Sequence, residues 1–211
     1  MQVRYCLKLS GNWKSSSLHK IFHLLIALFF SQTSFAEIPI SMDGMMYKLA
    51  TEQNDAAAQY FIGRNYLLGK TVKIDKREAA KWFAKAAEQE YPKAQFELGK
   101  LYLQGDGVKQ NFPVAFKLVS SAANKNIIDA QYTLATMHLK NINGFSKPNE
   151  AIKWLEKAIS GNYTPALYTL GKLFYEGTVV SSDKKHGKEL LEEAAEMGDP
   201  DAIDYLKSIH S

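Results

Sequence analysis

The sequence has almost no cysteine and little net charge, and each of these features excludes certain classes of protein. Cys6 is the only cysteine among 211 residues, so the chain can form no internal disulfide and no multi-thiolate metal site. It carries 26 Lys+Arg against 22 Asp+Glu, and the first 36 residues hold four of the cations and none of the acids. Residues 37–211 therefore have 22 charges of each sign. Without a net basic face we expect no nucleic-acid partner.

The first 36 residues have the order of a secretory signal peptide. A basic leader precedes an apolar run, 21–30, and Ser34 and Ala36 place small residues at the −3 and −1 positions of a cleavage site. A helix as short as this run spans about 15 Å, roughly half the hydrocarbon thickness, so we expect no stable membrane span. An uncleaved anchor is the alternative. We predict cleavage after Ala36 and export, to the periplasm or beyond the cell.

A residue pattern returns every 36 positions through the rest of the chain, and the stretch 93–102 displays it. Ala94, Leu98 and Tyr102 have counterparts in the other copies, and no insertion breaks the register. The columns read Ala58, Ala94, Ala130, Ala166, Ala202; then Ile62, Leu98, Leu134, Leu170, Leu206; then Tyr66, Tyr102, His138, Phe174, His210. Such self-similarity indicates a repeat array.

Each unit contains two helical patterns. In the first half, Ala58, Ile62 and Tyr66 fall on one face of a helix. Gly69 is expected to end this helix, and Gly105, Asn141 and Gly177 occupy the same position in the later copies. After a polar loop, the second helix has a stripe such as Ala79, Trp82, Phe83 and Ala86. The predicted fold class is all-α, a solenoid of about ten antiparallel helices. Its predicted parts are a half-unit 42–54, full units 55–90, 91–126, 127–162 and 163–198, and a terminal helix 199–211.

Glycine recurs inside the first helices at 63, 99 and 171, with Ala135 in the third unit. Glycine in a helix costs roughly 1 kcal/mol relative to alanine, so its recurrence indicates a neighbouring helix at close range. We expect Gly99→Leu to wedge the first two units apart and unfold the array.

The residues 75–89 and 93–102 resemble the Sel-1-like repeat, a relative of the tetratricopeptide repeat, whose unit is about 34 residues. The resemblance covers residues 42–210 and implies one domain over 37–211, a right-handed superhelix that binds other proteins. Some exported bacterial members are immunity proteins against lipase-type toxins, and a disulfide-rich subset, whose cysteines are missing here, has been linked to penicillin binding. The glycine that closes the second helix in the family is kept only at Gly198; Glu90, Asn126 and Asn162 replace it and put the turn geometry in question.

No catalytic, cofactor-binding or metal site is predicted, and no cofactor is expected. The sequence lacks a His-Glu-x-x-His helix, a Gly-x-Ser-x-Gly elbow and a phosphate-binding glycine loop. His138 and His210 fall in the aromatic column, where we expect core filling, and His186 is expected in a solvated loop. The Gly105–Gly107 stretch has one carboxylate, too few oxygens for calcium, and indicates a turn.

Positions that vary between copies are the candidate binding residues. In helical-repeat superhelices the first helices line the concave side, where partners dock. An Arg64, Lys100 and Lys172 ladder there suits an acidic or C-terminal carboxylate segment, whereas an ordinary solvated face is the alternative. The twelve candidates are Phe61, Arg64, Leu68, Glu97, Lys100, Gln104, Thr133, Thr136, Lys140, Thr169, Lys172 and Glu176.

The predicted function is an exported, non-enzymatic scaffold that binds a protein or peptide partner in its concave groove. We expect it to be monomeric. The alternative is a periplasmic immunity or inhibitor protein that neutralises a toxic envelope enzyme such as a secreted lipase. A cell-wall hydrolase is a third hypothesis, which rests only on the cysteine-bearing subset of the family.

Overall fold

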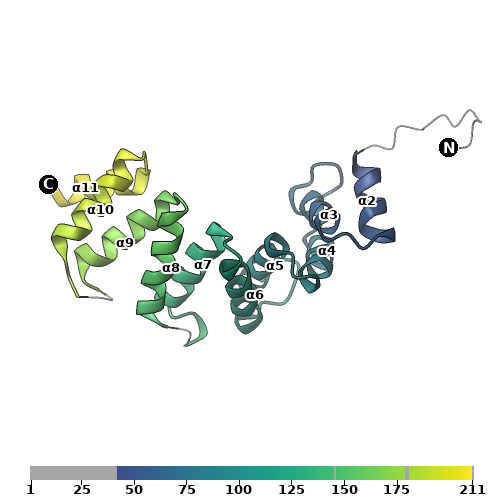
Figure 1. Cartoon of the computed structure of the whole chain (residues 1–211), viewed down its shortest axis with the longest axis horizontal. Coiled ribbons are helices and arrows are strands. Elements are labelled where there is room, and N and C mark those ends of the chain that lie inside the picture. Colours follow the sequence, from purple (N-terminus) through teal and green to yellow (C-terminus); the bar gives the residue numbers. More distant parts are fainter. Residues whose placement is uncertain (1–41, 145, 179–180, 211) are drawn as a thin grey trace, which may run out of the picture. The chain divides into compact units, whose positions relative to one another are not determined.

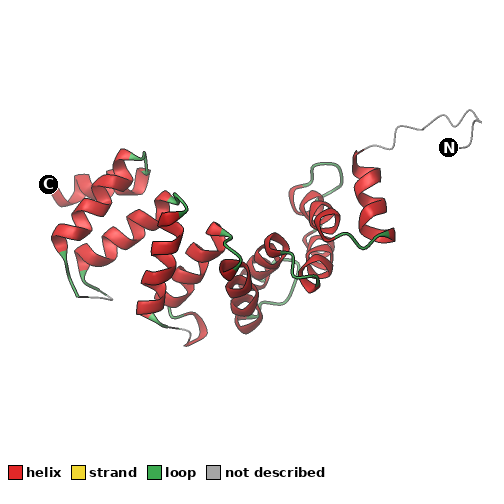
Figure 2. Cartoon of the chain, in the orientation of Figure 1, coloured by secondary structure: helices red, strands yellow, loops and turns green. Residues whose placement is uncertain are grey.

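The computed structural model describes residues 42–144, 146–178 and 181–210, and the predicted signal peptide lies outside them. These ranges contain ten α-helices, one 3-10 helix and no strand, which confirms the all-α prediction (Figures 1 and 2). The helices are α2 (Met42–Glu52), α3 (Ala56–Leu68), α4 (Lys76–Glu88), α5 (Pro92–Gln104), α6 (Phe112–Asn124), α7 (Ile128–Leu139), η1 (Ile142–Gly144), α8 (Pro148–Ser160), α9 (Thr164–Glu176), α10 (Lys184–Glu196) and α11 (Pro200–His210).

Each α-helix packs against the next one along the chain, from α2 to α11 (Figure 1). The pairs α3–α4, α5–α6, α7–α8 and α9–α10 are the four units, and α2 and α11 are single helices before and after them. We call α3, α5, α7 and α9 the first helices, and α4, α6, α8 and α10 the second helices. Because every contact of this kind is local in sequence, the array grows by addition of similar pairs.

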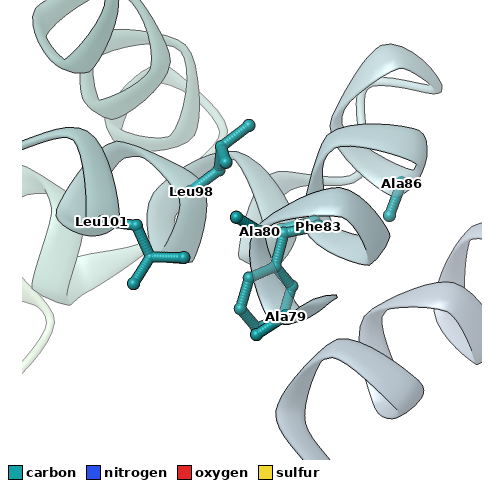
Figure 3. Close-up of a cluster of buried hydrophobic side chains, with 7 residues drawn as sticks. Ala79, Ala80, Phe83, Ala86, Leu98 and Leu101 are labelled. Atoms are coloured by element: carbon teal, nitrogen blue, oxygen red, sulfur yellow. The ribbon is translucent and has the colours of Figure 1, made fainter. Parts of the chain in front are cut away.

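The core is a string of clusters at the helix contacts. In one of them, Phe83 and Ala86 of α4 pack with Leu98 and Leu101 of α5, so the second helix of one unit is buried against the first helix of the next (Figure 3). Phe83 is fully buried, as are Val119, Leu155 and Leu191, which follow it at the 36-residue spacing in the later second helices. The apolar stripe read from the sequence therefore forms the core.

The helical glycines permit close approach inside a unit. A Cβ atom on Gly99 would lie 2.8 Å from Cγ2 of Val119, and one on Gly63 would lie 2.6 Å from Cε1 of Phe83. Val119 and Phe83 belong to the second helices of the same units. The prediction that Gly99→Leu would push the first two units apart was therefore wrong. Gly99 faces the other helix of its own unit, so a leucine there would separate α5 from α6.

The first helices end as predicted. Gly69, Gly105 and Gly177 have left-handed φ angles of 67°, 75° and 64°. Asn141 occupies the same column with φ 49°, one residue beyond the C-cap of α7. Glycine and asparagine tolerate this conformation best, which is why the chain can turn there.

The turns between units keep one geometry although three of them lack glycine. Glu90, Asn126, Asn162 and Gly198 all have positive φ, between 59° and 86°. Each turn also has the same two backbone hydrogen bonds, which in the first unit run from Glu90 N to the Ala87 carbonyl oxygen and from Tyr91 N to that of Ala86. Asparagine adopts this conformation readily, so the strain falls chiefly on Glu90.

The histidines follow the sequence expectations in part. His138 is buried and its ring lies edge-on to Phe116, with centroids 5.4 Å apart, so it fills the core as predicted. His186 is exposed but lies in the first turn of α10 and not in a loop, because the side chain of Asp183 accepts its backbone N–H and starts the helix there. The side chain of His210 lies outside the described part.

Candidate functional site

Two hollows lie along the first helices of the first three units. The first hollow, about 400 Å³, lies between α3 and α5 and reaches the start of α7. The second hollow, about 480 Å³, lies between α5 and α7 and reaches Tyr163. Phe96, Glu97 and Asp129 line both hollows, so the two form one continuous surface depression, which we call the inter-helix groove. Its size is that of a ligand site, and its walls come from successive repeats.

Five of the twelve candidate residues line this groove. Arg64 contributes to the first hollow, and Glu97 contributes to both. Lys100, Gln104 and Thr133 contribute to the second hollow. The structure thus brings together, from three consecutive first helices, side chains that lie up to 69 positions apart in the sequence.

The other seven candidates lie outside the two hollows. Thr169 contacts the groove wall, because its hydroxyl oxygen lies 3.2 Å from the hydroxyl oxygen of the groove residue Tyr132. Thr136 donates its hydroxyl to the Thr133 carbonyl, and Lys140 is the exposed C-cap of α7. Lys172 and Glu176 form an ion pair on α9, Phe61 is half-buried, and Leu68 is exposed at the end of α3.

An aromatic column that the sequence reading passed over forms part of the groove wall. Tyr60, Phe96, Tyr132 and Tyr168 recur at the same 36-residue spacing, one position before a candidate column. The first three line the hollows, and Phe96 is 9% exposed at the point where the hollows meet. The recurrence of aromatic residues at this spacing is the sequence feature from which this part of the groove could have been predicted.

Cations stand over these rings four residues later in the helix. The Arg64 guanidinium carbon lies 6.0 Å from the centroid of the Tyr60 ring, and Nζ of Lys100 lies 5.3 Å from that of Phe96. Outside the two hollows, Lys172 repeats the arrangement at 5.9 Å from the Tyr168 ring. These distances permit cation–π attraction, which is strongest where water is excluded.

The basic ladder read from the sequence is not uniform. Nζ of Lys100 lies 3.0 Å from Oε2 of Glu97, and Nζ of Lys172 lies 3.8 Å from Oε1 of Glu176. Within the described ranges no carboxylate oxygen lies within 4.0 Å of the Arg64 side chain. Arg64 is therefore the member of the ladder whose charge is left for a ligand.

Two of the tyrosines that line the groove, Tyr60 and Tyr163, have raised pKa values. Burial raises the pKa of Tyr60, although the nearby Arg64 charge opposes the shift. Burial also raises the pKa of Tyr163, and the negative charge of Asp129 adds to it. The groove thus offers aromatic faces, hydroxyl groups and one guanidinium that has no carboxylate partner among the described residues. These are features of a binding surface.

No group of three or more His, Cys, Asp and Glu side chains is placed to hold a metal ion in residues 42–144, 146–178 and 181–210. None of the helices in these ranges is long and apolar enough to cross a membrane.

Two solved structures are similar to this one over most of its length. A protective antigen of uropathogenic Escherichia coli strains, which displays an SLR fold, is 29% identical with a TM-score of 0.74; the match covers 80% of this chain and 36% of that one. The present chain thus spans about a third of that antigen. A Sel1 repeat protein from Oxalobacter formigenes is 28% identical with a TM-score of 0.69, over 84% of this chain and 70% of that one. No curated protein sequence gives a significant match.

A family model identifies the repeats directly. The model described as Sel1 repeat matches residues 56–91, 92–127, 128–163 and 164–199. Each match begins with the first residue of a first helix, and together the four cover most of the described chain. The chain belongs to the Sel1 repeat family.

Proposed function

We propose that this chain is an exported, non-catalytic scaffold that binds a protein or peptide partner in the inter-helix groove. Sel1 repeats typically act as protein-interaction scaffolds, which supports the general class. The basic leader, the apolar run 21–30 and the small residues Ser34 and Ala36 support export.

The observation that carries the proposal is the contrast between the groove and the packing columns. Alanine and leucine recur in the buried columns because every unit packs in the same way. The groove residues Glu97 and Thr133 occupy one column and differ, as do Phe61 and Thr169, which occupy the same column outside the two hollows. A surface that varies while its scaffold repeats can recognise one partner, because each unit presents different chemistry to it.

A bulky substitution in the groove tests the proposal. Thr133 is half-buried in the second hollow, so Thr133→Trp should fill that hollow without disturbing the buried columns. We expect the purified wild-type protein to capture a partner from its own envelope fraction, identified by mass spectrometry, and we expect the variant to lose it. Circular dichroism would check that the variant keeps its helices.

The matched control places the same side chain on a second helix. Lys117 of α6 is exposed, so Lys117→Trp adds an equal apolar surface away from the groove. Capture that survives in Lys117→Trp and disappears in Thr133→Trp supports the groove. Equal capture by both variants would rule it out as the docking surface. Recovery of the protein only from the cytoplasmic fraction would contradict export.

A further inference from the structure

Two cations and two carboxylates line the first hollow, and they differ in whether they already have a partner. In the middle of the groove, Glu97 is neutralised by Lys100. Asp129, which like Glu97 lines both hollows, lies beside the hydroxyl of Tyr163. Arg64 and Lys93 line the first hollow together with these two acids, and neither cation has a carboxylate oxygen within 4.0 Å among the described residues.

These two cations come from the two helices that flank the first hollow. Arg64 is on α3 and Lys93 is in the first turn of α5, and both side chains are exposed. Tyr60 lies beneath the guanidinium and Phe96 is largely buried at the inner end of the hollow. A carboxylate that enters here could accept charge-assisted hydrogen bonds from both cations and would have an aromatic surface beside it.

We infer that the first hollow is an acidic-side-chain pocket, which binds a glutamate or aspartate of an extended peptide between Arg64 and Lys93. The inference rests on the proposed function and specifies the chemistry of its ligand. Lys100 and Lys172 are excluded from this role because their own helices already supply a carboxylate to each. Anion recognition is thus confined to one end of the groove and does not run along the array.

The continuity of the groove favours a side chain over a chain terminus as the source of the carboxylate. The first hollow opens into the second through Phe96, Glu97 and Asp129, so a peptide backbone can continue past the pocket in the direction of Tyr132. An apolar or aromatic residue next to the acidic one would then lie against Phe96.

Fluorescence anisotropy with a defined probe tests the assignment. The probe is a short, labelled, amidated peptide that contains two glutamates around a phenylalanine, and its control has glutamine in place of both glutamates. We expect the wild-type protein to bind the glutamate peptide about tenfold more tightly, an advantage that shrinks as salt screens the charges. The double variant Arg64→Gln with Lys93→Gln should bind both peptides equally. Both positions are exposed, so the variant should keep the wild-type circular dichroism spectrum.

A matched variant and a second probe complete the experiment. Lys172→Gln removes a cation that is already paired, and we expect it to retain the wild-type preference. Equal binding of the two peptides by the wild-type protein, or no detectable binding of either, would overturn the inference. The second probe is the glutamine peptide with a free carboxyl end. Binding of this probe more tightly than the amidated glutamate peptide would also overturn the inference, because it would assign the pocket to a chain terminus. If partner capture is lost in Thr133→Trp but kept in the double variant, the groove function stands and the acidic pocket fails.

Discussion

Gly187 provides a sharp test of how the fourth unit packs. It lies in the first turn of α10, in the column where the other second helices have Ala79, Ala115 and Ala151. The column and helix propensity both suggest that Gly187→Ala should be stabilising. The structure predicts the opposite, because a Cβ atom there would lie 2.5 Å from the backbone N of Tyr175 and 2.7 Å from the backbone O of Gly171.

The expected change in the free energy of unfolding for Gly187→Ala is the sum of two opposing contributions. Alanine is favoured over glycine inside a helix by about 1 kcal/mol. Overpacking typically costs about 1–3 kcal/mol, and the upper part of that range applies because the atoms in the way are backbone atoms, which cannot rotate aside. The net change is a loss of about 1–2 kcal/mol. For a chain of this size that lowers Tm by roughly 2–8 °C.

Thermal unfolding followed by circular dichroism measures the effect, and Gly99→Ala is the control. At Gly99 the nearest atom is a side-chain methyl of Val119 at 2.8 Å, and the next contacts lie at 3.4 Å, so a small shift relieves the clash. We expect Gly99→Ala to lose much less stability than Gly187→Ala. Amide hydrogen exchange should rise in α9 to α11 only for Gly187→Ala. A Gly187→Ala protein as stable as the wild type would refute the close backbone packing of α9 and α10.

Three further substitutions probe the turns and the polar contacts. Glu90→Gly should stabilise the protein by about 1 kcal/mol in denaturant unfolding, because φ is 59° there; a loss would show that the turn is not strained. In Tyr205→Phe, the free energy of unfolding should fall less between pH 10 and pH 12 than it does in the wild-type protein. Burial and its hydrogen bond to Glu176 raise the pKa of Tyr205 from 10.0 to about 12, so its contribution is complete below pH 10 and disappears as the pH rises through that window; parallel pH profiles of the two proteins would contradict this. Gln131→Leu should change the unfolding free energy by less than about 1 kcal/mol, because the Ala123 carbonyl that Gln131 binds keeps a second donor, and a larger loss would show that this hydrogen bond is critical.

The helix pairs could be predicted from the sequence because their determinants are local and repeated. The Ala94 and Leu98 columns mark a buried face at helical spacing, and Gly105 marks the end of the same helix. Each signal lies within one turn or one helix, and its recurrence at one period removes the ambiguity that a single copy would have. His186 was misplaced because a run of lysines suggests a loop, although Asp183 stands in the column of the N-cap residue Asp75.

The groove could be predicted only in part, since it depends on contacts between helices. The sequence pointed to the first helices, and Arg64, Glu97 and Thr133 do line the hollows. It did not show which helix faces Gly99, because a glycine at helical spacing fits a contact inside a unit as well as one between units. Nor did it show that Lys93, outside the candidate columns, lines the same hollow as Arg64.

For Arg64, Lys100 and Lys172, by contrast, the presence or absence of a carboxylate partner has a cause that is visible in the sequence. Lys100 has Glu97 three positions before it and Lys172 has Glu176 four positions after it, which are the spacings at which side chains on one helix meet. Arg64 has only tyrosine, phenylalanine and leucine at those spacings, so no acid on its own helix can neutralise it. An unpaired guanidinium is therefore built into the first unit and not into the later ones. On the acidic-pocket proposal, a partner would therefore place its acidic residue between α3 and α5, at the start of the array.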